Sequence, residues 1–247
     1  AGEAVAQALQ SDGVRVRVGR KIASVRRAHD DGGLVATLDD GGELAGDVLL
    51  LAAGRRANTA ELGLEAWGFQ PGRPVPVDEH LRAQGVPGDW LYVVGDPNGR
   101  AMLTHMAKYQ GRIAGDHILG KDVEAWALDR AVPRVVFSDP QVASVGLTEA
   151  MARQKGLDIG IAAFPTGDVA GASVRGEGAT GTSKLVIDRA RQVVVGATFT
   201  GHDISELLHS ATIAIAGEVP LERLWHAVPS FPTVSEVWLR LLQAWGL

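Results

Sequence analysis

The sequence feature that most constrains the fold is a continuously apolar run at residues 47–53, Asp-Val-Leu-Leu-Leu-Ala-Ala, which ends abruptly at Gly54-Arg55-Arg56. A strand with one solvent-exposed face alternates apolar and polar residues, whereas a strand covered on both faces is apolar throughout. The run therefore predicts a buried strand of an α/β sheet. Ligands commonly bind beyond the carboxyl ends of such strands, and glycine lets a ligand approach the backbone closely, so Gly54 is a candidate binding residue. A tight turn at Gly54 is the alternative.

The residues before this run predict a helix followed by an antiparallel meander. Residues 3–10 suit a helix. Alternation and β-branched residues then favour strands in three segments, at residues 14–18, 21–28 and 34–38. Two clusters of the form Asp-Asp-Gly-Gly, at residues 30–33 and 39–42, favour tight turns because glycine adopts positive φ without steric strain.

A second apolar run, residues 90–94, predicts another buried strand that ends in Gly95-Asp96. A link rich in proline and glycine, residues 70–77, leads to it. Apolar residues, with one glutamine among them, then recur at helical spacing between Leu103 and Ile118, and Gly120 predicts the end of that helix. Residues 122–132 are typical of a linker.

The remainder of the chain predicts a mixed domain of strands and helices. We expect strands near residues 134–137, 142–146, 158–164, 183–188 and 193–199. We expect helices near residues 148–155, 203–217 and 233–245. Strands gathered beside helices indicate an α+β domain. The glycines at positions 146, 176, 178 and 181 do not join a strand to a helix in the way that a phosphate-binding loop does, so they predict turns.

Composition narrows the classes of function. The 247 residues are 46% apolar, which suffices for a sizeable core, and the formal charge is -5 with no cluster of basic residues, so we expect neither nucleic acid nor a membrane surface as a partner. No apolar run approaches the roughly 20 residues that span a bilayer. With no cysteine the chain has neither a disulfide framework nor a thiolate metal site, and we expect no metal. Because the first residues, Ala1 to Val5, lack Met and a signal pattern, we expect a segment of a longer chain.

Four segments in the same order resemble the FAD-dependent pyridine nucleotide-disulfide oxidoreductases, a family that includes dihydrolipoamide dehydrogenase, glutathione reductase and mercuric reductase. They are residues 50–59 (LLAAGRRANT), residues 90–107 (WLYVVGD followed by MLTHMA), residues 132–149 (VPRVVFSDPQVASVGLTE) and residues 231–236 (FPTVSE). The resemblance covers nearly the whole chain. It implies the carboxyl-terminal half of such an enzyme.

The resemblance implies three parts: the end of a nicotinamide-binding domain at residues 1–56, the end of an FAD-binding domain at 57–124, and an α+β dimerisation domain at 125–247. It also implies a cytoplasmic homodimer that transfers electrons from NAD(P)H through FAD to a disulfide, quinone or other small acceptor. The missing amino-terminal half would complete the protein. The family's amino-terminal glycine fingerprints and its Cys-x4-Cys pair are absent from these residues.

Site residues follow from the resemblance together with their own chemistry. Asp96 would accept hydrogen bonds from the ribityl chain of FAD, since ionised acceptors form strong hydrogen bonds; a cap or turn aspartate is the alternative. The backbone of Met102, Leu103, Thr104 and His105 would face the flavin ring from the positive end of a helix. The resemblance places NAD(P) at Gly54.

The sequence does not assign a single role to Arg55, Arg56 or His105. Arg55 and Arg56 suit a phosphate, a carboxylate or a solvated surface equally well. For His105, an ordinary satisfied ring is as good a reading as a chemical role.

One departure concerns the terminal motif, in which the family has histidine. Phe231 stands in its place, and a benzyl group cannot transfer a proton. Glu236, which in the family orients that histidine, remains as the only catalytic position, while His226 lies five residues upstream of Phe231 and is more typical of a surface or interface histidine. The departure favours a second interpretation: a non-catalytic dimerisation fragment or pseudoenzyme of the same family.

Overall fold

The computed structural model describes residues 1–28, 32–174 and 180–247. The chain divides into two compact units: Leu9–Arg56, and Ala57–Leu247 together with Ala1–Ala8. In the described ranges, no helix has both the length and the apolar character needed to cross a membrane. The three-domain assignment made from the sequence stays a prediction.

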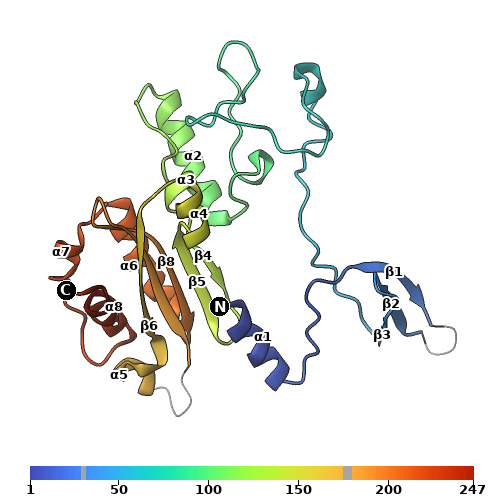
Figure 1. The fold of residues 1–247 in the computed structure, drawn as a ribbon. Coiled ribbons are helices and arrows are strands. Elements are labelled where there is room, and N and C mark those ends of the chain that lie inside the picture. Colours follow the sequence, from blue (N-terminus) through green and yellow to red (C-terminus); the bar gives the residue numbers. More distant parts are fainter. Residues whose placement is uncertain (29–31, 175–179) are drawn as a thin grey trace. The chain divides into compact units, whose positions relative to one another are not determined.

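The smaller unit is built on a three-stranded antiparallel sheet of β1 (Ile22–Arg27), β2 (Leu34–Leu38) and β3 (Glu43–Gly46), in that order (Figure 1). Helix α1 (Gly2–Ser11) precedes it in the sequence, as predicted. The meander is confirmed, but its third strand is β3 and not residues 14–18. Those residues pair with no described strand, and a strand needs such a partner for its backbone groups. The predicted turn at residues 30–33 lies largely outside the described residues, although Gly32 has φ 77°.

The prediction of a buried strand at residues 47–53 is wrong for this chain. The segment forms neither helix nor strand, and Val48, Leu50 and Leu51 are 88%, 86% and 76% exposed. A continuously apolar strand is stable only where neighbouring strands pair with both its edges and other elements cover both its faces. The smaller unit supplies neither the neighbouring strands nor the cover, so the apolar pattern of residues 47–53 was not enough to form a strand.

Residues 57–132 of the larger unit contain two short 3-10 helices, η1 (Leu64–Trp67) and η2 (Asp96–Asn98), and two helices, α2 (Thr104–Ile118) and α3 (Ala127–Arg130). The helix between Leu103 and Ile118 is confirmed. The strand at residues 90–94 is wrong: only Tyr92 forms an isolated bridge, with Arg82, and Trp90 is 57% exposed. Buried side chains of α2 and α3 share one core.

The rest of the larger unit is a five-stranded antiparallel sheet with the order β4-β5-β8-β7-β6. Its strands are β4 (Arg134–Val136), β5 (Gln141–Gly146), β6 (Ile159–Pro165), β7 (Thr182–Asp188) and β8 (Val193–Gly201). The register places Val145 of β5 opposite Ala197 of β8. All five strands fall where the sequence predicts them, because each alternates or runs apolar between clear turn signals.

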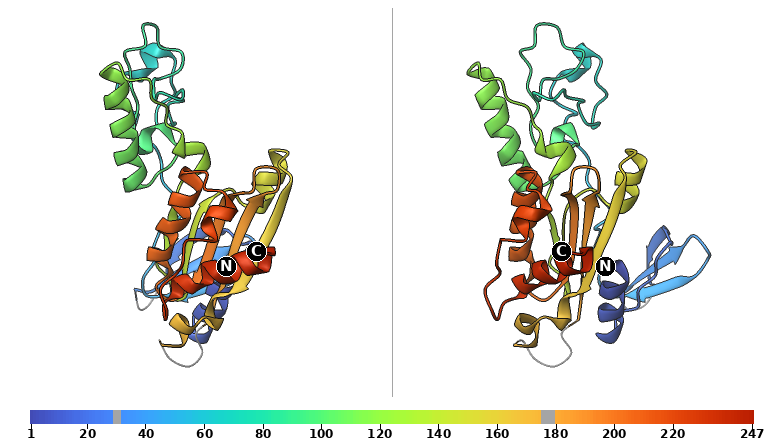
Figure 2. Two further views of the ribbon diagram at one scale, coloured as in Figure 1. Left: turned by 90° about the vertical axis from the view of Figure 1, so that its left-hand side faces the viewer. Right: turned by 60° about the vertical axis from the view of Figure 1, so that its left-hand side comes forward.

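Helices cover both faces of this sheet. The larger core joins one face to α6 (Ile204–Ala216) and α8 (Val237–Trp245), which Figure 2 shows side by side on the sheet. The opposite face packs on α4 (Glu149–Gln154) through Ala152, Ile159 and Val186. Shorter pieces complete the unit: η3 (Thr166–Asp168), α5 (Ala170–Ser173), α7 (Leu221–Leu224) and η4 (Val234–Glu236). The mixed α/β fold with two antiparallel sheets agrees with the predicted fold class.

Two of the glycines predicted as turns are described. Gly146 ends β5 with φ 79°, and Gly181 lies just before β7 with φ 143°. A side chain at either position would meet backbone atoms of β8, so both glycines also permit close strand packing. Gly176 and Gly178 lie outside the described residues.

Candidate functional site

The turn after residues 90–94 is a compact 3-10 structure. Gly95 has φ 78° and ψ -150°, a conformation that side chains disfavour, and the N–H of Asn98 donates to its carbonyl at 3.2 Å. The N–H of Gly99 donates to the carbonyl of Asp96 at 3.0 Å. A Cβ at Gly95 would lie 3.2 Å from the Cβ of Ala107, so the turn packs tightly on α2. Asp96, half-buried, is thereby held beside the start of that helix.

A buried glutamine of α2 fastens this turn. Gln110 is 0% exposed, and its Oε1 accepts from the N–H of Gly95 and from Nδ2 of Asn98, both at 2.7 Å. Asn98 Nδ2 also donates to the carbonyl of Val93 at 2.9 Å. Among the described residues, Gln110 Nε2 has no hydrogen-bond partner. Sequence reasoning gave Gln110 no role, although a glutamine at apolar helical spacing was the available signal.

The amino terminus of α2 provides backbone donors at Thr104 and His105, whereas the N–H of Leu103, also predicted to face the flavin, donates to the carbonyl of Ala101 at 2.9 Å. Its N-cap, Leu103, has an extended conformation and no side-chain cap, and the first backbone N–H groups of a helix have no partner within it. Thr104 and His105 are exposed, while Met102 and Leu103 are half-buried. The ring of His105 is hydrogen-bonded through Nε2 to the carbonyl of Pro133 at 2.9 Å, which accounts for the ring without any chemical role.

The turn and the helix start together suit a ligand with hydroxyl groups and an electron-rich ring. The half-buried carboxylate of Asp96 is an acceptor for hydroxyl groups, and the first amides of α2 with the positive helix end favour negative charge. The buried amide of Gln110 contacts the turn through Oε1, and both N–H donors of its Nε2 are unused among the described residues. These residues fit the flavin that the sequence predicts.

Gly54, the predicted NAD(P) position, lies in the smaller unit. It has φ 125°, and a Cβ there would meet no atom within 4 Å. Arg55 and Arg56 beside it are exposed. This conformation favours glycine for its backbone freedom and is compatible with both the binding role and the simple turn.

The terminal motif contains a carboxylate that is already engaged. Glu236 Oε1 accepts from Arg240 Nη2 at 2.8 Å, and Oε2 accepts from the N–H of Ala170 at 3.3 Å. Its side chain is 12% exposed, whereas Phe231 is 78% exposed. No hydrogen bond among the described residues joins Glu236 to His226. In this chain Glu236 therefore connects α8 to α5, and the structure does not bring His226 to it. No group of metal-ligating side chains was found in the described ranges.

Two family models match the chain. The pyridine nucleotide-disulphide oxidoreductase model matches residues 1–111, and the dimerisation-domain model of the same family matches residues 132–241. Dihydrolipoyl dehydrogenase from Chlamydia muridarum is 32% identical over 92% of this chain and 47% of its own length. The Bacillus subtilis enzyme of the same name is 35% identical over 83% of this chain and 43% of its own length.

Solved structures agree with the sequence relatives. LpdA from Mycobacterium tuberculosis superimposes with a TM-score of 0.86 and 26% identity, covering 99% of this chain and 52% of LpdA. The HOCl-induced flavoprotein disulfide reductase RclA from Escherichia coli gives a TM-score of 0.81 and 25% identity, covering 96% of this chain and 54% of RclA. The chain thus spans about half the length of the relatives that it matches. Members of the family are flavoproteins that use FAD and NAD(P)H, and this chain belongs to the pyridine nucleotide-disulphide oxidoreductase family.

Proposed function

We propose that the intact protein is an FAD-dependent oxidoreductase that transfers electrons from NAD(P)H through the flavin to a disulfide, a quinone or another small acceptor. One observation carries the proposal. The turn that presents Asp96 is held by the buried Gln110 and leads into the uncapped amino terminus of α2. The buried hydrogen bonds of Gln110 and Asn98 fix this turn, so that Asp96 is held beside an open helix end, as a site for the ribityl chain and the flavin ring would require.

Each residue has a defined task in this proposal. The carboxylate of Asp96 binds and orients hydroxyl groups of the ribityl chain, and the amides of Thr104 and His105 stabilise negative charge on the ring edge. Gly54 leaves room for NAD(P) near the backbone. Bound FAD would supply the redox chemistry itself, while the protein supplies position and electrostatics.

The proposal extends to the organisation of the intact protein. We assign residues 1–56 to the nicotinamide-binding domain, 57–124 to the FAD-binding domain and 125–247 to the dimerisation domain. The match to the dimerisation-domain model supports a homodimer. The missing amino-terminal half would supply the remaining cofactor contacts. Light scattering at micromolar concentration that finds only monomers would reject the homodimer.

A second candidate, a non-catalytic member of the same family, has one observation in its favour. Phe231 replaces the expected proton donor, and Glu236 is engaged with Arg240 and Ala170. The colour of the purified intact protein separates the two candidates. An oxidoreductase retains flavin, which absorbs near ~450 nm as expected of a bound flavin cofactor, and NAD(P)H bleaches this band. A colourless protein that does not take up added FAD supports the second candidate.

The test of the site is Asp96→Ala in the intact protein. Loss of one charged hydrogen bond should weaken FAD binding by about 1.5–3 kcal/mol, because the ribityl hydroxyls lose their ionised acceptor. Asp96→Asn, which keeps a neutral acceptor, should weaken binding less. The measurement is the fraction of FAD retained through gel filtration, together with the Kd of FAD for the stripped protein.

Asp122→Ala is the matched control, because Asp122 is an exposed loop carboxylate outside the turn. It should retain FAD as the unmodified protein does. Full retention by Asp96→Ala would show that Asp96 is only a turn residue.

A further inference from the structure

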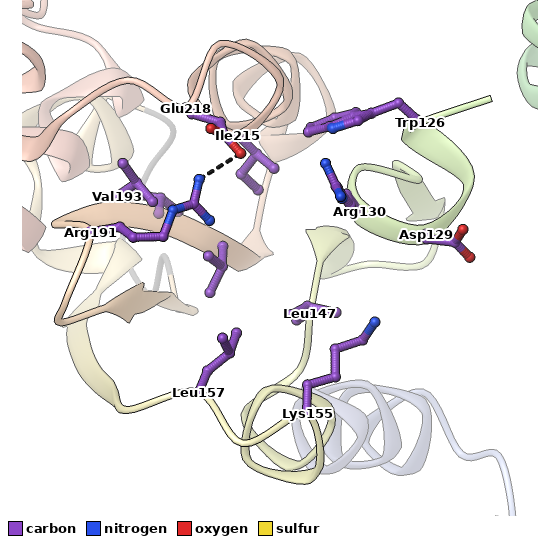
Figure 3. Close-up of a pocket in the computed structure, with 12 residues that line it drawn as sticks. Trp126, Asp129, Arg130, Leu147, Lys155, Leu157, Arg191, Val193, Ile215 and Glu218 are labelled. Atoms are coloured by element: carbon purple, nitrogen blue, oxygen red, sulfur yellow. Dashed lines mark ion pairs between the residues drawn. The ribbon is translucent and has the colours of Figure 1, made fainter. Parts of the chain in front are cut away.

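A pocket of about 340 Å³ lies in the larger unit, where β8 begins and α3, α4 and α6 approach one another (Figure 3). It shares no residue with the Gly95–His105 site. Its volume falls within the range of small-molecule sites, roughly 300–1,000 Å³. The pocket is therefore large enough to be considered as a separate binding site.

The floor of this pocket is aliphatic. It consists of Leu147, Leu157, Val193, Val194, Val195 and Ile215. Of the 12 residues that line the pocket, Trp126 alone carries an uncharged hydrogen-bonding group, its indole N–H. A sugar or a nucleotide base would leave several of its own polar atoms unpaired against such a floor, which is unfavourable. The body of the ligand should accordingly be apolar.

The rim of the pocket carries an excess of positive charge. Its two carboxylates are both engaged: Glu218 pairs with Arg191 at 2.6 Å, and Asp129 pairs with Arg100 at 2.6 Å. Figure 3 shows Asp129 pointing away from the other lining residues, whereas Arg130 points toward Trp126 and Lys155 extends from α4 beside Leu147.

Arg130 and Lys155 are the remaining charges of the rim, and both also border an adjoining pocket that Glu79 and Glu124 line. Arg130 lies over the Trp126 ring at 5.1 Å, and within the described ranges neither it nor Lys155 forms an ion pair. The rim therefore favours one anionic group.

We propose that this pocket binds a small amphipathic carboxylate, with its aliphatic body on the floor and its carboxylate between Arg130 and Lys155. The apolar body supplies most of the binding free energy, since each buried methylene tightens binding by about fourfold. The two exposed cations select the charge and orientation of the ligand. The pocket shares no lining residue with the proposed flavin site, although Arg100, between Gly95 and His105, pairs with Asp129 of the rim.

Octanoate is the probe, and the test uses the intact protein with ligand-observed NMR titrations. Octanoate should bind with a Kd on the order of 1 mM, a value typical of a ligand with so few atoms. 1-Octanol and octylamine have the same body without the negative charge, and each should bind at least about tenfold more weakly. Butyrate, which has the charge but four fewer methylenes, should bind at least about 100-fold more weakly, so that no binding is detected.

Variants locate the site. Arg130→Met and Lys155→Met keep the length of the side chain and remove its charge, and each should raise the Kd of octanoate about threefold, the double variant about tenfold. Lys121→Met is the control, because Lys121 is an exposed lysine outside the pocket, and it should leave the Kd unchanged. Equal binding of 1-octanol, an unchanged Kd in the double variant, or no binding of octanoate at all would each overturn the proposal.

Discussion

At the scale of single residues, polar side chains fix the conformation of loops in the larger unit through hydrogen bonds to the backbone. Gln110 and Asn98 shape the turn at Asp96, and neither could be assigned from the sequence. An isolated glutamine in a helical pattern does not indicate which distant backbone N–H it will meet. Asp96 was predicted from its motif and stays a prediction as a site residue, whereas the residues that hold it depend on packing between α2 and the turn.

A second such loop depends on Asp78. Its Oδ1 accepts from the N–H groups of Arg82 at 2.9 Å and His80 at 3.0 Å, and its Oδ2 accepts from Arg82 Nε at 2.8 Å. Burial raises the pKa of Asp78, but the N–H and guanidinium of Arg82 and the N–H of His80 together lower it below its ordinary value of 3.8. These bonds enclose Leu81, a fully buried leucine with φ 71°.

Asp78→Asn should therefore lower the free energy of unfolding of the intact protein by about 1 kcal/mol near pH 7. Because the pKa in the folded state is depressed, this contribution is fully present well above 3.8 and is lost as the pH falls through the folded-state pKa. The difference between the variant and the unmodified protein should stay constant above about pH 5 and shrink below about pH 4. Urea denaturation at a series of pH values measures it.

Asp116→Asn serves as the comparison, because in the described part of the chain the Asp116 carboxylate pairs with Lys121 alone, at an exposed position. Its effect should stay within about 0.5 kcal/mol. A gap for Asp78→Asn that does not change between pH 7 and pH 3 would show that its charge has no part in the loop.

At the scale of elements, the contact between α5 and η4 connects the terminal motif to the sheet. A Cβ at Gly171 in α5 would collide with the backbone of Thr233 and Val234, which cannot move aside as a side chain can. The N–H of Ala170 donates to Glu236 across the same contact. Close packing of two backbones therefore requires glycine here.

Gly171→Ala should destabilise the intact protein by about 1–3 kcal/mol or more through overpacking. Gly115→Ala makes the same chemical change within α2, where a Cβ would meet no atom within 4 Å. There alanine should stabilise the helix by roughly 0.5–1 kcal/mol. Urea unfolding midpoints compare the two. If both variants shift the midpoint in the same direction, close backbone packing at Gly171 does not exclude a side chain there.

The elements also show where sequence reasoning succeeds. The five strands of the larger unit and the helices α2, α4, α6 and α8 were predicted correctly. Each has a clear periodicity of apolar residues and is bounded by turn or cap residues. Residues 14–18, 47–53 and 90–94 were predicted as strands and are not. Strand formation depends on pairing partners as well as on pattern, and those segments have none among the described residues beyond the single bridge at Tyr92.

At the scale of the whole molecule, the aromatic residues near the carboxyl terminus divide into two groups. Trp238 is 9% exposed and Trp245 packs against the larger core, with the guanidinium of Arg189 over its ring at 5.2 Å. Trp225 and Phe231 are 38% and 78% exposed. The first pair belongs to the core, so we expect only the second pair to anchor the proposed two-fold interface.

The exposed position of Phe231 bears on the reaction that we propose for the intact protein. A histidine there would supply a proton to a thiol, and general acid–base assistance is worth roughly 10²–10⁴ in rate. Phe231 cannot supply one. Hydride transfer from NAD(P)H to the flavin needs no such group, so we expect fast flavin reduction and slow turnover on disulfides, with quinones less affected.

Stopped-flow reduction of the flavin by NAD(P)H, compared with steady-state turnover on lipoamide, glutathione disulfide and a quinone, measures the two half-reactions separately. Phe231→His should raise disulfide turnover at least about tenfold and leave flavin reduction unchanged, whereas Phe231→Leu should change neither. The pH profile of the Phe231→His variant should show the titration of an imidazole. If the unmodified protein reduces disulfides as fast as it reduces its flavin, and His226→Ala does not slow it, another residue donates the proton and Phe231 does not limit the reaction.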